Sequence, residues 1–181
     1  TPVQLALREA YSALTTALER ARLTLARWST SESDFRDVRC AYQRFFPGVE
    51  YQTPDYFRGI IEHIQEVQGR ILIIPVYEVP TYLLRHPNIP DEVISASRAE
   101  DLPAFSFPLN NPTHIVLLPS WYQNRDLRVT RIIHEAFHIV FPYIRHTQVS
   151  HPRERPHEDA FAYQGFVSTI TRLSYGTGVT G

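Results

Sequence analysis

Apolar residues in the first third of the chain recur every three or four positions, which is the spacing of a helix packed along one face. The spacing predicts three helices, over residues 2 to about 28, about 34–46 and 54 to about 68. Pro47-Gly48 is expected to stop the second helix, and Gly69 to cap the third in a left-handed conformation. The expected inward faces are Leu7, Tyr11, Leu14, Leu18, Ala21, Leu25 and Trp28, then Phe35, Val38, Tyr42, Phe45 and Phe46, then Phe57, Ile60, Ile61, Ile64 and Val67.

After Gly69 the helical spacing gives way to runs of β-branched and aromatic residues. Residues 70–77, Ala104–Phe107 and His114–Leu118 are predicted to be strands of a small mixed sheet within about residues 70–118. Residues 80–103 hold four prolines and are expected to be a loop with one short helix near 91–100. The pattern as a whole predicts an α+β fold, mostly helical, in one domain over residues 1–181.

A second apolar run, Ile132 to Phe141, is interrupted only by His134, Glu135 and His138. It belongs to a predicted helix of about 126–141, which Asn124 or Asp126 is expected to cap. On a helix the two histidines lie one turn apart on one face, so both rings can point at one metal ion. Unpaired polar groups on a buried helix cost several kcal/mol, and a metal ion would satisfy them. Hydrogen bonds to backbone or carboxylates are the alternative.

A catalytic zinc ion takes three protein ligands, so a third must come from outside this helix. The last predicted helix, about 156–173, offers Glu158 and Asp159 near its start. The helix dipole favours an acid in the first turn, which explains one of the two but hardly both together with His157. His63 is expected to be at the surface or hydrogen-bonded rather than a ligand. The remaining candidates for the third ligand are His157, His146 and His151.

The His-Glu-x-x-His motif resembles that of the zincin metallopeptidases. The thermolysin-like (gluzincin) branch, which we favour over the alternative below, has a Glu ligand on a later helix. This resemblance implies Glu158, 20 residues after His138, although Ala162 replaces a second acid that is common there. The deuterolysin-like (aspzincin) branch implies Asp159 and Tyr163, although its Gly-Thr-x-Asp-x-x-Tyr-Gly pattern is not reproduced. The metzincin pattern, His-Glu-x-x-His-x-x-Gly-x-x-His, is absent because neither its Gly nor its last His is present.

The resemblance implies a zincin-like domain that acts as a zinc metalloendopeptidase on protein or peptide substrates. It implies Glu135 as the general base, Tyr163 as the residue that stabilises the oxyanion, with Tyr143 and Tyr122 as alternatives, and a substrate strand paired with His114–Leu118. Two other hypotheses stay open. One is a catalytically inactive zincin-like binding or regulatory module, and the other is hydrolysis of a non-peptide amide.

Composition excludes several other classes. The 181 residues are 43% apolar and 20% charged, as in an ordinary globular domain, and the net charge of −1 gives no preference for nucleic acid. No apolar run approaches the roughly 20 residues of a membrane span. Cys40 is the only cysteine, so an internal disulfide is excluded. Because the chain has no methionine, we expect a processed chain or an excised domain, either from a secreted bacterial protein or from the cytoplasm.

Overall fold

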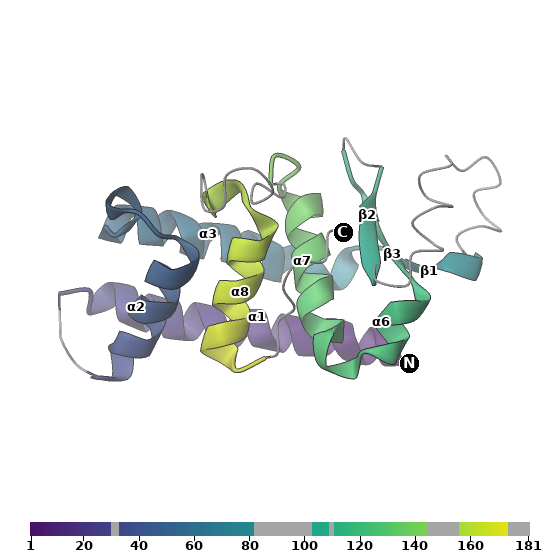
Figure 1. The fold of residues 1–181 in the computed structure, drawn as a ribbon, viewed down its shortest axis with the longest axis horizontal. Helices are drawn as coiled ribbons and strands as arrows, with labels where there is room; N and C mark the ends of the chain where they lie inside the picture. The colour runs from purple at the N-terminus through teal and green to yellow at the C-terminus, as the bar shows by residue number, and fades with distance from the viewer. Residues whose placement is uncertain (30–32, 82–102, 109–110, 145–155, 174–181) are drawn as a thin grey trace.

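A computed structural model gives the fold of residues 1–29, 33–81, 103–108, 111–144 and 156–173 (Figure 1). The fold is α+β, mostly helical with a three-stranded mixed sheet, which confirms the predicted class. No helix in these ranges is long and apolar enough to cross a bilayer. The elements are α1 (Pro2–Ala26), α2 (Ser33–Phe45), η1 (Val49–Tyr51), α3 (Pro54–Arg70), η2 (Ile71–Ile73), β1 (Val76–Glu78), β2 (Ala104–Phe107), β3 (His114–Leu117), α6 (Pro119–Gln123), η3 (Arg125–Leu127), α7 (Arg128–Val140), η4 (Pro156–Glu158) and α8 (Ala160–Thr171).

Helix α1 runs along the long axis of the molecule, and α2, α8 and α7 cross it (Figure 1). Its first turn is fixed by a capping box, in which the backbone N–H of Gln4 donates to the Thr1 hydroxyl. The predicted inward face is partly wrong, because Tyr11 is 38% exposed. Small side chains occupy the inner face and allow the crossing helices to approach closely: Ala6, Ala10, Ala13, Ala17 and Ala21.

Aromatic rings join α2, α3 and α8 into the core. The ring centroids of Tyr42 and Phe57 are 4.6 Å apart, and Phe46 meets Phe166 edge-on. The predicted stop at Pro47-Gly48 is confirmed, since α2 ends at Phe45 and Gly48 has a φ of 119°. Aromatic contacts of this kind add to the hydrophobic burial and hold α8 in a defined orientation.

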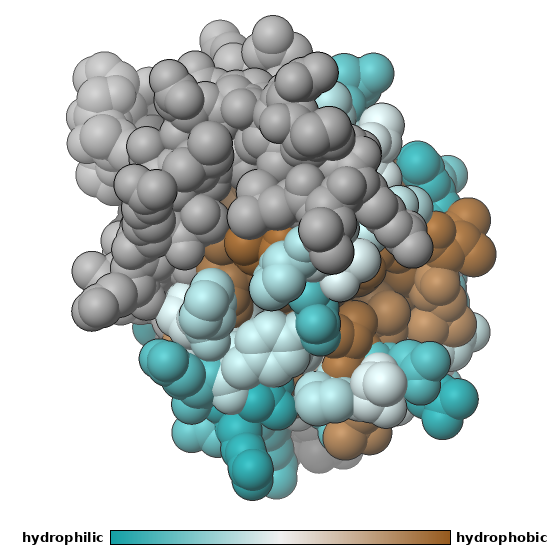
Figure 2. All heavy atoms as spheres, turned by 90° about the vertical axis from the view of Figure 1, so that its right-hand side faces the viewer, coloured by the Kyte–Doolittle hydropathy of each residue, from teal (hydrophilic) through white to brown (hydrophobic). Residues whose placement is uncertain are grey.

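The end of α3 differs from the prediction. The helix continues through Gly69 to Arg70, Ile71 donates to the Val67 carbonyl, and a 3₁₀ turn follows. Residues 70–77 are therefore mostly not a strand, and β1 begins only after Pro75. In the turn Ile71 is buried, but Leu72 and Ile73 are 51% and 77% exposed. They add to the apolar surface of the described chain, some of which is visible at the sheet end of the molecule in Figure 2.

The sheet has the order β1-β3-β2, with β3 in the centre. β1 pairs with β3 in parallel, and β2 pairs with β3 antiparallel, Ser106 lying opposite Ile115. Both sides of β3 are therefore occupied by neighbouring strands. The expectation that His114–Leu118 would pair with an extended substrate is wrong, because that strand has no open edge.

The segments around α7 and α8 also differ from the prediction. Asn124 precedes the turn η3, and α7 follows Leu127 without a side-chain cap, so neither Asn124 nor Asp126 caps it. The short helix α6 was not predicted. α8 begins at Ala160, and the Asp159 carboxylate caps it by accepting from the Phe161 amide. The predicted helix start at 156 is instead the turn η4.

Gly165 lies where α8 meets α2. A Cβ at this position would lie 2.1 Å from the Phe45 ring, whereas one at Gly59 would meet no atom within 4 Å. We expect Gly165→Ala to lower the free energy of unfolding by about 1–3 kcal/mol through overpacking. Gly59→Ala, also within a helix, should raise it by up to about 1 kcal/mol. Urea denaturation measures both changes, and equal effects of the two substitutions would contradict this packing.

Candidate metal centre

Other elements enclose α7, the helix that carries the motif, on several sides. It contacts α1, α3 and α8 and packs against β2 and β3 of the sheet. Its side chains from Val129 to Phe137 are buried, and His134 and Glu135 are fully inaccessible to solvent. His138 is partly exposed. The expectation of a buried motif helix is therefore confirmed, and its polar motif residues require partners inside the protein.

The two imidazole rings of the motif meet at their Nε2 atoms, which are 3.2 Å apart. The opposite nitrogen of each ring contacts an acceptor. His138 Nδ1 lies 2.8 Å from the Ile144 carbonyl oxygen, and His134 Nδ1 lies 2.8 Å from Gln164 Oε1. Since a carbonyl oxygen only accepts, each Nδ1 carries a proton. In the neutral rings both Nε2 atoms then present a lone pair to the same point.

Two lone pairs facing each other at this distance repel unless a cation lies between them. That cation is either a proton shared by the rings or a metal ion bound by both of them. Zinc binds imidazole nitrogen at about 2.0–2.1 Å, and tetrahedral geometry then separates two such nitrogens by about 3.3 Å. The observed 3.2 Å matches this spacing. Hydrogen bonds from both Nδ1 atoms to fixed acceptors are also the usual arrangement of zinc-binding histidines. The geometry of the pair is therefore compatible with both histidines binding one zinc ion.

Glu135 lies beside this pair and faces the sheet. Burial raises the pKa of its carboxyl group to about 8, against the opposing effects of the Arg131 charge and of Ser106 on β2. Neither carboxylate oxygen completes a hydrogen bond of good geometry within the described part of the chain. A cation bound by the histidines would favour the ionised form and lower this pKa. The carboxylate is thus placed to take up and release a proton.

The two predicted acidic ligands differ in their surroundings. Asp159 is buried, with 6% exposure, and precedes Phe161, whose ring centroid is 4.5 Å from that of His134. Glu158 is partly exposed, and its carboxylate lies 3.9 Å from His157 Nε2. Asp159 is therefore the buried acid next to a residue that contacts the imidazole pair.

A complete ligand set is not assembled in the ranges that the structure covers. Within them, no three His, Cys, Asp or Glu side chains are grouped to hold one metal ion. Two of the predicted third ligands, His146 and His151, lie outside those ranges. The structure therefore brings together His134 and His138, and places Glu135 beside them, without a third ligand.

The tyrosines predicted to stabilise an oxyanion have other contacts. Tyr163 is fully buried, its ring is stacked on Phe137, and its hydroxyl donates to the His157 carbonyl. Its hydroxyl oxygen is also 2.7 Å from His63 Nδ1. The expectation that His63 is hydrogen-bonded is thereby confirmed. Through these hydrogen bonds Tyr163 links α8 to α3 and η4.

The other two tyrosines lie nearer the surface. Tyr143 is 48% exposed and lies three residues after the end of α7, with its hydroxyl 3.3 Å from His63 Nε2. Tyr122 donates to the carboxylate of Glu78 on β1. Of the three, Tyr143 is the one that combines exposure with a position beside Ile144, which orients His138.

Sequence reasoning missed the groups that orient the motif. Gln164 is 1% exposed within a largely apolar helix, and a long polar side chain in such a helix was a visible signal. Ser106, a polar residue in a mostly buried strand, was another. The Ile144 carbonyl had no such signal, because every residue carries a backbone carbonyl and only the fold shows where it points.

No protein-family model, curated protein or solved structure matches this chain. The resemblance to zincins therefore rests on the motif residues themselves. The geometry of the imidazole pair is a separate, physical reason to consider a metal there.

Proposed function

We propose that this protein is a zinc-dependent metallopeptidase in which His134 and His138 hold the metal and Glu135 is the general base. One observation carries the proposal. The two Nε2 atoms face each other at 3.2 Å while both Nδ1 atoms contact acceptors. This leaves two nitrogen lone pairs directed at one point, with a carboxylate on the adjacent position of the same helix.

Zinc bound at this point supplies a Lewis acid that polarises a peptide carbonyl and makes water more acidic. Glu135 accepts a proton from the attacking water at a carboxylate oxygen and passes it to the leaving amine nitrogen. Arg131 and Ser106 favour the ionised carboxylate that this first step requires. Gln164 and Ile144 accept from the Nδ1 atoms, which directs the Nε2 lone pair of each ring toward the metal position.

We favour Asp159 over Glu158 as the third ligand. Asp159 is buried and lies two residues from Phe161, which packs on His134. Glu158 is more exposed and faces His157 and Tyr143. A buried carboxylate that neutralises part of the metal charge is the better match to a site inside the fold.

A peptide substrate would lie along β2 rather than β3. Of the two outer strands described, β2 packs against α7 and brings Ser106 to Glu135. An extended peptide can add to such an edge through main-chain hydrogen bonds. This arrangement would place the scissile bond beside the general base.

Glu135→Gln tests the catalytic role while keeping the shape of the buried side chain. We expect the variant to bind zinc as the unmodified protein does and to lose cleavage of a peptide library almost entirely, because the proton acceptor is gone. Bound zinc is measured by metal analysis, and a chelator should abolish cleavage by the unmodified protein. Cleavage by the variant at the unmodified rate would falsify the mechanism.

The same assays separate the other two hypotheses. A protein that binds zinc but cleaves no peptide in the library is better explained as a binding or regulatory module. Hydrolysis of a simple amide without peptide cleavage would indicate a non-peptide substrate.

Asp159→Asn tests the third ligand, because Asn is as good a helix N-cap as Asp and only the charge is lost. We expect zinc affinity to fall at least about tenfold, which corresponds to about 1.4 kcal/mol of binding free energy, with little change in melting temperature. Glu158→Gln is the matched control and should bind zinc normally. The reverse result assigns Glu158, and normal binding by both variants excludes the two acids.

A further inference from the structure

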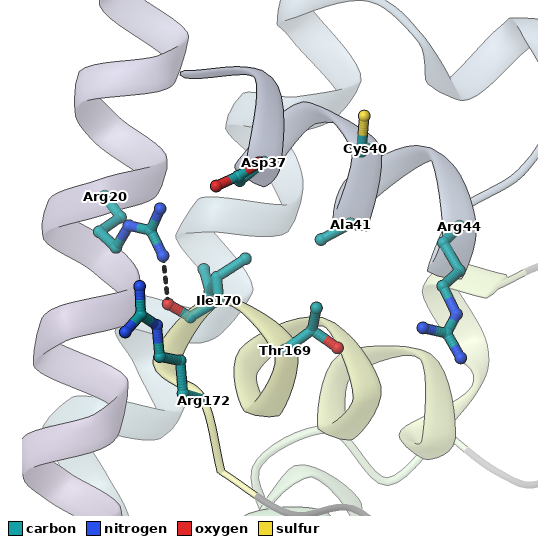
Figure 3. Close-up of a pocket in the computed structure, with 8 residues that line it drawn as sticks. All are labelled: Arg20, Asp37, Cys40, Ala41, Arg44, Thr169, Ile170 and Arg172. Carbon is teal, nitrogen blue, oxygen red and sulfur yellow. Dashed lines mark hydrogen bonds between the residues drawn. The ribbon is translucent and has the colours of Figure 1, made fainter. Parts of the chain in front are cut away.

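A groove of about 340 Å³ lies at the C-terminal end of α8, where α8 meets α1 and α2 (Figure 3). The groove is separate from the candidate metal centre. On α8 it is lined by Thr169, Ile170 and Arg172, whereas Asp159 and Gln164 lie in the N-terminal half of the helix, and the imidazole pair is on α7. The residues that matter for its chemistry are Arg20, Asp37, Cys40, Arg44 and Arg172.

The lining of the groove is strongly basic. Three helices contribute an arginine: Arg20 from α1, Arg44 from α2 and Arg172 from the end of α8. Asp37 is the one acidic residue of the lining, so the groove carries two net positive charges in a chain whose net charge is −1. Such a concentration of one sign in a concave site attracts ligands of the opposite sign.

Two of the guanidinium groups are positioned by the fold. Arg20 Nη1 donates to the Ile170 carbonyl, which fixes the side chain and leaves its other N–H donors for a ligand. The Arg44 guanidinium lies 5.0 Å from the centre of the Phe45 ring. Donors held in place before a ligand arrives lose less conformational freedom on binding.

Arg172 occupies a conformation that arginine rarely adopts. Its φ is 61°, and it is the one non-glycine residue of the described chain with positive φ. Glycine or asparagine usually takes this left-handed position after a helix, because a Cβ there is strained. A strained residue with a long cationic side chain at the rim of a basic groove points to a role for that side chain.

From these observations we propose that the groove binds the phosphate group of a small molecule. A phosphate carries nearly two negative charges at neutral pH, and its oxygens match the fork of the guanidinium group. The three arginines supply the donors, and Asp37 accepts a hydrogen bond from a hydroxyl of the same ligand. The proposal does not depend on the peptidase proposal.

Calorimetry and thermal melting of the intact chain with inorganic phosphate test the site, with glycerol 3-phosphate as an ester and acetate at equal ionic strength as a carboxylate. We expect saturable binding of phosphate or its ester, a higher melting temperature, and neither effect with acetate. Bound phosphate should also slow alkylation of Cys40 by iodoacetamide severalfold, because this single, exposed thiol lines the groove.

Arg172→Gly separates binding from folding, because glycine suits the left-handed backbone and removes only the side chain. We expect this variant to be at least as stable as the unmodified chain and its phosphate affinity to fall at least about tenfold, the loss expected for a charge-assisted hydrogen bond. Arg8→Gln removes a positive charge outside the groove and should leave affinity unchanged. Equal affinity in all three proteins, equal binding of acetate, or no saturable binding would each overturn the proposal.

Discussion

The need to satisfy a carboxylate and two imidazoles on a buried helix is the constraint on which this structure depends. His134 and Glu135 are fully inaccessible on α7, and each unpaired polar group there costs several kcal/mol. Part of that cost is offset by hydrogen-bond partners from other elements: Gln164 on α8, the Ile144 carbonyl in the turn after α7, and Ser106 on β2. The Nε2 atoms of the two histidines face each other, and the Glu135 carboxylate lies beside them. A metal ion would satisfy these groups together.

The packing of the other helices holds these hydrogen-bond partners in position around α7. The alanine face of α1 lets α7 and α8 cross it closely, and Gly165 allows α8 to approach the Phe45 ring of α2. Tyr163 fixes the start of α8 through the His157 carbonyl and His63. Close packing resists small displacements, so the 2.8 Å contact between Gln164 and His134 is maintained by the whole helical core.

Hydrophobic periodicity was enough to predict the helices of the first 69 residues, two of the three strands and the motif helix. It failed where the same local sequence is compatible with two structures. The β-branched run after Gly69 was interpreted as a strand, but α3 continues to Arg70 and a 3₁₀ turn follows, in which Leu72 and Ile73 are exposed. Helix α7 was expected to have a capping side chain, but it follows a 3₁₀ turn that leads directly into it.

Spatial relations were beyond the reach of the sequence. Nothing in His114–Leu118 shows that it is the central strand, because strand order depends on which segments pair. The motif itself was visible, yet the orientation of its rings depends on Gln164, 30 residues away from His134, and on a backbone carbonyl. The basic groove is assembled from three helices that are far apart along the chain.

The most direct measurement of the central claim is a crystal structure of the protein grown with zinc, with anomalous data collected on both sides of the zinc absorption edge. We expect one anomalous peak between the rings, about 2.0–2.1 Å from Nε2 of both His134 and His138. A map without a peak there, with the two rings hydrogen-bonded directly to each other, would contradict the claim that this pair exists to bind a metal.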